Sequence, residues 1–508
     1  MKPEDLMDGI GKVEDDLLKR SEGNIGERKS AEKKGFRRLL LPIAAAAVVL
    51  AVSGGILLVK SGILRKKSGG ILDPFSDSTL QKYAIAAAVY PKSAAFPNLA
   101  DYDMEKDDGE QYIKDLNAWI EENASRRDKL IDYGTEKATG SVAEFTTSSM
   151  ISMLSDRNGE NRAYSPITIY LTLAMLAEIT DGNTRKQILT LVGADSVADI
   201  RTRADALWNA VYKNDSSGKC VLGSSVWLRD DTDSYKKKVL ENLAQYYHAS
   251  SFRGKMGTAE YNKALQTWIN NQTGGLLEKE AGDITLDSGT MLGLVTTILY
   301  QARWGDEFAP GLTDTGIFHA SKGDLNVSYM HRTESSGMYY RGDKFVAVPK
   351  HFTSEASAYM WFILPDEGVT VDELLSDPQV HRLLEKGAEG KCHPAIVDLT
   401  VPKYDLTSLI DLCGVLRKMG LTDVFDAMKS DFTPLFKKGN GYYVSEAKHA
   451  VRVMVDEEGV KAAAFTEIQV AGAILMEDRI EFTLDRPFLF AIQTYDNIPL
   501  FVGVVEQP

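Results

Sequence analysis

The chain has 508 residues, of which 44% are hydrophobic and 26% charged, an ordinary composition for a folded protein with a large core. Its net charge of −14 argues against a nucleic-acid partner, because phosphate binding requires a basic surface. The three cysteines are widely spaced and form no Cys-x-x-Cys pair, so neither a zinc site nor a disulfide framework is expected. One pair could still bridge, but buried free thiols are the favoured interpretation.

An uncharged apolar stretch near the N-terminus predicts a membrane-spanning helix. It covers residues 39–59, which is about the length that crosses a bilayer, and it follows a polar tail at 1–38. A secretory signal peptide cleaved near Ser53 is the alternative, but the long tail and the length of the apolar run favour an uncleaved helix. Basic residues are more numerous before the span than after it, which favours a cytoplasmic tail and a large domain outside the cell.

Residues 60–140 are predicted to form a linker or extension ahead of the main domain, which we place at 141–508. The extension contains an acidic patch at 101–110 and a helix from Glu110 to about Tyr133. An apolar stripe along this helix predicts a packing face rather than a cofactor site. We assign no function to the extension.

The main domain mixes helical and strand patterns. Helices are predicted over Val142–Leu154 and Tyr261–Gln272, and a strand over Ser224–Leu228. A short strand is predicted to lead into a buried helix. This helix begins at Ser165-Pro166, where proline is well tolerated.

The segment from Val460 to Val470 is predicted to be a latent strand, able to enter a sheet but not held in one. Alternate residues fall on two faces, and the face that begins at Val460 carries no charge. Its first half is rich in alanine, a poor strand former, and Gly459 precedes it as a flexible joint. Only an uncharged face can enter a sheet core without a large desolvation cost.

The sequence at 457–466, EEGVKAAAFT, resembles the reactive-loop hinge of the serpins, the suicide protease inhibitors. The C-terminal sequences FTLDRPFLF (482–490) and LFVGVVEQP (500–508) match the same family. Further matches follow in chain order: Ser165-Pro166 with the helix after it, the apolar run 294–304, FILPDEG at 362–368, a strand at 397–406, a helix at 416–425 and a strand ending at Val455. The resemblance covers about residues 145–508.

The resemblance implies an α+β serpin fold with three β-sheets, including a large mixed central sheet A, about eight to nine helices and an exposed reactive loop. It implies no cofactor and no metal site. The expected molecule is a monomer whose partner is a serine protease. We expect a bacterial member of the family, anchored in the membrane by its N-terminal helix or secreted after cleavage.

The resemblance also assigns roles to residues. The loop hinge comprises Glu457, Glu458, Gly459, Val460, Ala462, Ala463, Ala464 and Thr466. The sheet-opening region comprises Ser165, Thr168, Thr296 and His449, and the breach, where the loop enters the sheet, comprises Trp304 and Lys403. Lys403 is expected to pair with Glu457. The family usually has asparagine where this chain has Thr296, so the hydrogen bonds that control sheet opening must differ here.

The position of the cut sets the choice of protease. Counting from Gly459 by the family's usual spacing places Ala473 before the cut bond and Ile474 after it. Counting back from the C-terminal motif gives Met476, and Leu475 is a further alternative. Alanine suits an elastase-like pocket, and leucine or methionine an elastase-like or chymotrypsin-like one. The inward hinge positions carry no proline or charge, so we expect inhibition.

No pattern in the sequence supports an enzyme. The seven histidines form no metalloprotease motif, Ser165 lies in no Gly-x-Ser-x-Gly elbow, and no phosphate-binding loop is present. The expected activity is mechanical: the cut loop inserts into sheet A and the protease is captured covalently. The alternative is a non-inhibitory protein of serpin fold, used for binding or adhesion at the cell surface.

Overall fold

The computed structural model describes residues 73–508, apart from 92–95, 99–100, 103–108, 216–217, 231–234, 354–355, 437–440 and 461–477. The chain divides into two compact units: residues 1–67, 94–121 and 463–474, and residues 68–93, 122–462 and 475–508. Among the described residues, no helix has the length and apolarity needed to cross a membrane. The predicted span at 39–59 lies outside the described residues and stays a prediction.

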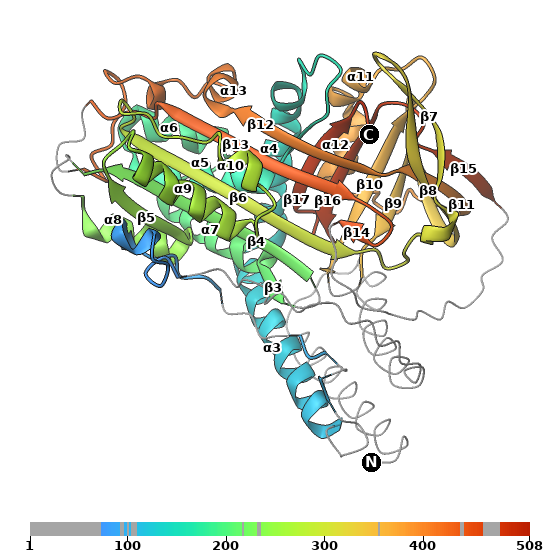
Figure 1. Ribbon diagram of the computed structural model, residues 1–508, viewed down its shortest axis with the longest axis horizontal. Coiled ribbons are helices and arrows are strands. Elements are labelled where there is room, and N and C mark those ends of the chain that lie inside the picture. Colours follow the sequence, from blue (N-terminus) through green and yellow to red (C-terminus); the bar gives the residue numbers. More distant parts are fainter. Residues whose placement is uncertain are drawn as a thin grey trace, which may run out of the picture. The chain divides into compact units, whose positions relative to one another are not determined.

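The larger unit contains two β-sheets (Figure 1). The strands of the first sheet are β1 (Ala84–Ala86), β3 (Lys213–Asp215), β4 (Gly218–Arg229), β5 (Ala249–Gly254), β6 (Leu292–Arg303), β12 (Tyr404–Asp411), β13 (Glu446–Val455) and β14 (Gly459–Val460). Their order is β1-β5-β4-β6-β14-β13-β12, with β3 paired to β4. The sheet is mixed, because β6 runs antiparallel to β4 and parallel to β13.

The strands of the second sheet are β2 (Arg162–Tyr164), β7 (Asp314–Ala320), β8 (Gly323–Arg341), β9 (Phe345–His351), β10 (Ala358–Pro365), β11 (His393–Pro402), β15 (Arg479–Thr483), β16 (Phe488–Thr494) and β17 (Pro499–Val505). Their order is β15-β11-β8-β9-β10-β16-β17-β2, with β7 paired to β8. The long strand β8 pairs with β7 and β11 along most of its length and with β9 at its end. Strand β8 thus joins two parts of the second sheet, one that contains β7 and β11 and one that contains β9. Together with the first sheet, these two parts correspond to the three predicted sheets.

The α-helices are α3 (Gly109–Tyr133), α4 (Thr135–Leu154), α5 (Pro166–Ile179), α6 (Gly182–Leu191), α7 (Val197–Val211), α8 (Lys237–Tyr246), α9 (Ala259–Gln272), α10 (Glu278–Ala281), α11 (Val371–Leu375), α12 (Pro378–Lys386) and α13 (Leu412–Lys418). Short 3-10 helices are η1 (Leu80–Lys82), η4 (Pro310–Leu312) and η6 (Asp423–Phe425). From α4 onward the described residues contain ten α-helices, not the expected eight to nine. The excess includes α10 and α11, which are too short for a helical pattern to show in the sequence.

The helix predicted over 416–425 is displaced toward the N-terminus. Helix α13 begins earlier because the Asp411 side chain accepts a hydrogen bond from the backbone N–H of Cys413, at 3.1 Å. It ends at Lys418, before Gly420, whose φ of 94° suits glycine and stops the helix. The remainder of the predicted helix is a turn followed by η6.

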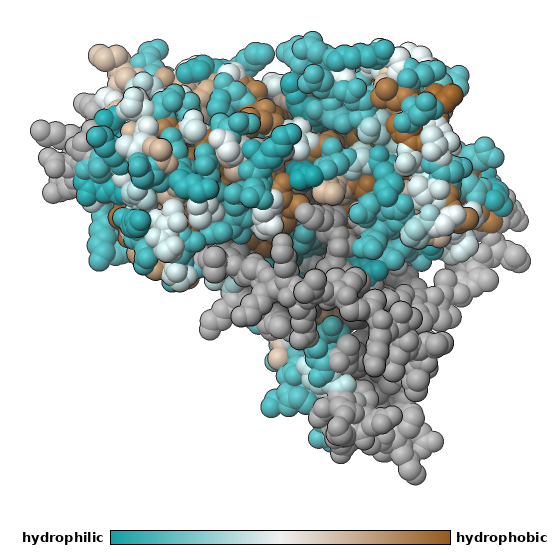
Figure 2. Space-filling view, in the orientation of Figure 1, coloured by the Kyte–Doolittle hydropathy of each residue, from teal (hydrophilic) through white to brown (hydrophobic). Residues whose placement is uncertain are grey.

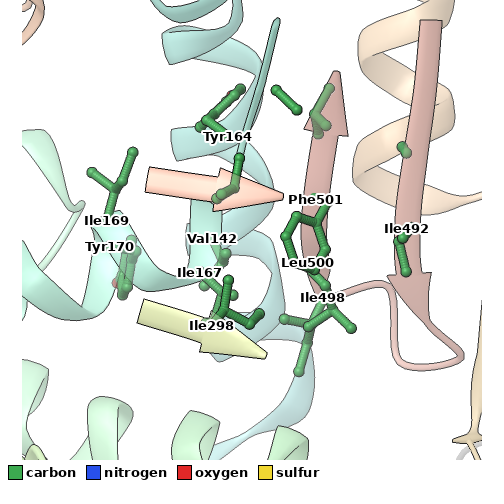
Figure 3. Packing of buried hydrophobic residues seen from close by; sticks show 14 of the residues in the cluster. Val142, Tyr164, Ile167, Ile169, Tyr170, Ile298, Ile492, Ile498, Leu500 and Phe501 are labelled. Carbon is green, nitrogen blue, oxygen red and sulfur yellow. The ribbon is translucent and has the colours of Figure 1, made fainter. Parts of the chain in front are cut away.

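Helix α5 forms the centre of the core between the two sheets. All of its residues except Thr172 are buried, and it packs against β6 of the first sheet and β17 of the second. Figure 3 shows Ile167 of α5 close to Ile298 of β6, with Leu500 and Phe501 of β17 beside them. Full burial of such a side chain stabilises the fold by about 1.5–3 kcal/mol.

Helix α9 lies across the opposite face of the first sheet, over β4 and β6 (Figure 1). The surface seen on this side is mostly hydrophilic (Figure 2). The first sheet is therefore covered on both faces, which explains why β4 and β6 are buried along most of their length.

Part of the predicted extension belongs to the first sheet. Strand β1 pairs antiparallel with β5, and the N–H of Arg253 donates to the carbonyl of Tyr83 at 2.8 Å. Leu80, only 1% exposed, joins an apolar cluster with Trp227, Phe252 and residues of α9. The extension thus adds an edge strand beside β5.

The three cysteines are free, as favoured from their spacing. Cys220 and Cys413 are buried and Cys392 is partly buried.

Candidate functional site: a divided sheet and its hinge

Strands β6 and β13 are parallel neighbours that pair at one end only. Glu446 to His449 lie opposite Gly293 to Thr296. At the other end β14 separates the two strands: Val460 lies opposite Val455 of β13 and Ala302 of β6. Between these ends, residues 297–301 and 450–454 have no strand partner on their facing edges within the described part of the chain. We call this gap the slot.

Two hinge residues, Gly459 and Val460, already occupy the mouth of the slot. The Val460 side chain is 3% exposed and shares the core face with Val455 and Ala302. Gly459 has φ of 155°, and a Cβ at this position would lie 2.2 Å from the carbonyl oxygen of Ala302. Only glycine therefore permits so close an approach of the hinge to β6. The other inward and outward hinge positions, Ala462, Ala463, Ala464 and Thr466, lie outside the described residues.

The turn that joins β13 to β14 is held by two backbone amides and one indole beside β6. The N–H and the indole Nε1–H of Trp304 donate to the carbonyls of Glu458 and Asp456, each at 3.0 Å. The N–H of Phe308 donates to the carbonyl of Glu457 at 3.0 Å. Trp304 is buried, and its ring stacks on that of Phe352 with centroids 4.8 Å apart. The residues 304–308, which we call the shelf, thus fix the backbone of the hinge turn.

The expected ion pair at the hinge is present. The Lys403 Nζ donates to Glu457 Oε2 at 2.7 Å, and the Thr313 hydroxyl donates to Oε1 at 2.8 Å. Burial alone would raise the pKa of Glu457, but the hydrogen bonds from Lys403, from its own backbone and from Thr313 outweigh burial and hold the pKa below the usual 4.5. The carboxylate is therefore charged at neutral pH.

This pKa shift predicts a pH-dependent contribution to stability. A carboxylate whose pKa is lowered by folding adds stability above its unfolded pKa and loses it as the pH falls through the folded pKa. We expect Glu457→Gln to reduce stability by about 1 kcal/mol at neutral pH, since Lys403 is half-exposed, and to have little effect well below pH 4.5. Thermal scans of both proteins from neutral to acid pH measure the difference. If the difference in stability between the two proteins stays constant over this pH range, the role assigned to the Glu457 carboxylate is contradicted.

The residues of the predicted sheet-opening region lie at the closed end of the slot. His449 and Thr296 face each other across β13 and β6. The backbone N–H of Ser165 donates to His449 Nε2 at 2.9 Å, and the Thr168 hydroxyl donates to the carbonyl of Ser165 at 3.0 Å. The structure therefore brings all four residues together.

His449 carries an unused hydrogen-bond donor. It is fully buried, and burial lowers its pKa to about 3, so the ring is neutral at ordinary pH. Because Nε2 accepts from Ser165, the proton sits on Nδ1, which has no hydrogen-bond partner among the described residues. Thr296 does not approach it as a partner: its hydroxyl lies 3.1 Å from that of Thr172. Thr172 had no predicted role, although it stands one helical turn after Thr168.

The predicted cut bond, Ala473 to Ile474, and the alternatives Leu475 and Met476 lie outside the described residues. Two contacts of the hinge were missed from the sequence: the Thr313 hydroxyl and the Phe308 amide. Threonine is common in loops, and a backbone amide carries no sequence pattern. Neither contact could have been found before the fold was known.

A model of one protein family, described as Serpin (serine protease inhibitor), matches residues 141–508. Alpha-1-antiproteinase 2 of Equus caballus is 27% identical over 396 residues, covering 76% of this chain and 90% of that protein. Serpin-ZX of Arabidopsis thaliana is 26% identical over 373 residues, covering 68% of this chain and 92% of that protein.

Solved structures give the same result. The thermophilic serpin tengpin in its native state matches with a TM-score of 0.66 at 25% identity, over 73% of this chain and 94% of that one. Thyroxine-binding globulin in complex with thyroxine matches in fold, with a TM-score of 0.64 at 22% identity, over 73% of this chain and 99% of that one. The chain belongs to the serpin family, whose members are for the most part serine protease inhibitors rather than enzymes.

Proposed function

We propose that this protein inhibits a serine protease as a suicide substrate. The protease serine attacks the carbonyl carbon before the cut bond, an ester forms, the peptide bond breaks, and the amine of the next residue leaves. The N-terminal half of the loop then enters the slot as a new strand and carries the acylated protease with it. The observation that supports this proposal is the slot itself, open between β6 and β13, with Val460 already seated at its mouth.

Continuing the observed register indicates where the loop would lie. Val460 is antiparallel to both neighbours, opposite Val455 and Ala302. Each later even-numbered residue then falls on the core face, as the uncharged alternation requires. Ala462 would lie between Val453 and Tyr300, Ala464 between Val451 and Ile298, and Thr466 between His449 and Thr296. Alanine suits the first two places because both neighbours there are large and buried.

Insertion would proceed in two stages. Residues up to Phe465 would enter between edges that have no strand partner, and each ladder hydrogen bond contributes about 1 kcal/mol. Further insertion would separate the β6–β13 pairs, beginning with His449 and Thr296. It would also bury Ile468 and Val470, each worth about 1.5–3 kcal/mol. Val460 is already buried and adds nothing new, so the total is on the order of ten kcal/mol or less.

The register also predicts a partner for the unused donor of His449. Thr466 Oγ1 would accept from Nδ1 at the point where the β6–β13 pairs begin to separate. We expect Thr466→Val to raise the number of inhibitor molecules cleaved per protease trapped about fivefold, the effect of one net hydrogen bond, while Thr466→Ser stays at the parent value. Titration of the protease with each variant measures this number. Equal numbers for the valine and serine variants would contradict the contact.

The proposed target is an elastase-like protease that cuts at Ala473-Ile474, or a chymotrypsin-like one that cuts after Leu475 or Met476. Mixing the protein with elastase should give a covalent complex that survives denaturation, and mass spectrometry of the released C-terminal fragment should locate the bond. Cleavage with no such complex would overturn the proposal and favour a non-inhibitory role in binding or adhesion at the cell surface.

We further propose that the protein acts as a monomer outside the cell, tethered by the segment 39–59 or released by cleavage near Ser53. The support is the length and neutrality of that segment and the excess of basic residues before it. Recovery of the full-length chain in a washed membrane fraction tests the tether.

A further inference from the structure

A lysine is buried directly beneath the shelf. Lys350, on β9, is 3% exposed, and its Nζ donates to the carbonyl of Asp306 at 2.6 Å and to the carboxylate of Glu334. The same Nζ lies 5.1 Å from the ring centroid of Phe308 and 5.9 Å from that of Trp304. Burial of an ammonium group is costly, so a buried lysine is retained where its charge has specific partners.

The partners of Lys350 are the residues that hold the hinge. Asp306 lies in the middle of the shelf, and Trp304 and Phe308 are its two ends. The backbone amides of Trp304 and Phe308 donate to the carbonyls of Glu458 and Glu457, and the Trp304 indole donates to the carbonyl of Asp456. The Lys350 ammonium therefore ties the middle of the shelf to β9 while the two ends hold the hinge turn.

A second basic residue beside Lys350, Arg332, also holds the shelf. Arg332 pairs with Asp306 at 2.8 Å and with Glu334 at 3.3 Å, and it donates to the carbonyl of Glu307 at 2.7 Å. Burial lowers the pKa of Lys350, and the carboxylate of Glu334 opposes this shift. The ammonium of Lys350 has a carboxylate, a carbonyl and two aromatic rings as partners, and the two rings belong to the residues that donate to the hinge turn.

We infer that Lys350 is a positioning residue that keeps the first pair of the new strand, Val460 with Val455 and Ala302, formed before the loop is cut. This inference rests on the proposed function. The hinge turn already has the register that the inserted strand would continue, so insertion starts from a formed nucleus and proceeds along the slot. Without the ammonium the shelf loosens, the nucleus opens, and insertion must first close the hinge again. The bound protease then has more time to hydrolyse the ester and escape.

The test compares Lys350→Met with Lys344→Met. Methionine keeps the apolar stem of Lys350 but loses the ammonium, and Lys344 is an exposed lysine near the same strand, whose Nζ is 3.4 Å from Glu373. We expect Lys350→Met to be cleaved by elastase at the parent initial rate and to require about five times more inhibitor per protease trapped. Lys344→Met should match the parent. If Lys350→Met loses stability but needs no more inhibitor per protease trapped than the parent, the inference is overturned.

A second measurement needs no protease. Hydrogen exchange of the intact protein should show faster exchange of the Trp304 and Phe308 amides in Lys350→Met than in Lys344→Met. Unchanged protection of these amides would overturn the role of Lys350. If the parent forms no complex while the exchange result holds, the proposed function fails and the positioning of the hinge by Lys350 stands.

Glu334→Gln gives an independent test should Lys350→Met not fold. It keeps the shape of the side chain and removes the carboxylate partner of Nζ. As for Lys350→Met, we expect Glu334→Gln to require more inhibitor per protease trapped and to show faster exchange of the Trp304 and Phe308 amides. A parent-like result for Glu334→Gln in both measurements would count against the inference.

Discussion

Arginine at position 460 should convert the inhibitor into a substrate. Val460 is 3% exposed and lies between Val455 and Ala302 on the core face, so the guanidinium of Val460→Arg would enter a site between two apolar side chains. An unpaired buried charge costs several kcal/mol, and the strand would therefore fail to seat at the mouth of the slot. The protease should cut the loop at the parent rate but form no complex that survives denaturation.

Val460→Ala is the matched control. It removes volume from the same site without adding charge, and most of its inhibition should remain, because alanine already occupies the next inward positions. The two variants are compared by electrophoresis after mixing with elastase. A Val460→Arg protein that traps protease as completely as Val460→Ala would show that residue 460 does not enter the sheet.

Replacement of Gly459 should have the second large effect. In Gly459→Val the new Cβ would meet the carbonyl oxygen of Ala302 at 2.2 Å and the Cα of Arg303 at 2.7 Å, both of them backbone atoms that cannot move aside. The φ of 155° adds strain for any residue with a side chain. We expect the hinge to leave the slot, with a loss of about 2–4 kcal/mol and a fall of several degrees in the thermal midpoint.

Gly311→Val provides the control for this variant. Gly311 lies near the same end of the sheet, and a Cβ there would have no neighbour within 4 Å. Thermal scans of the two variants separate the close contact at 459 from a general effect of valine. Equal midpoints for Gly459→Val and Gly311→Val would contradict the seating of the hinge against β6.

The sequence predicted those parts of the fold that depend on local pattern. The helix expected over Tyr261–Gln272 is α9, and the apolar run 294–304 is β6 within two residues at its start. The charge-free face from Val460 was predicted by alternation and is confirmed at its first residue. Local patterns were sufficient here because burial of one face of a strand or helix repeats with a fixed period.

Other features depend on contacts between residues far apart in the chain. The indole of Trp304 reaches the carbonyl of Asp456, and β14 enters between β6 and β13. Lys350 is a charged residue in strand β9, and a lysine is ordinarily expected to face water. It is buried instead, and its partners come from β8 and from the shelf. Strand β1 is a three-residue segment of alanine and isoleucine, and only its pairing with β5 identifies it. Such contacts follow from topology and leave no pattern in the local sequence.

Thermal unfolding of the intact and the loop-cleaved protein tests the central claim most directly. The claim is that the intact chain holds an unfilled slot, so that its fold is not the one of lowest free energy. We expect cleavage between residues 461 and 477 to raise the thermal midpoint by about 10 °C or more, because insertion is worth several kcal/mol. A cleaved protein that melts at or below the midpoint of the intact one would contradict the account.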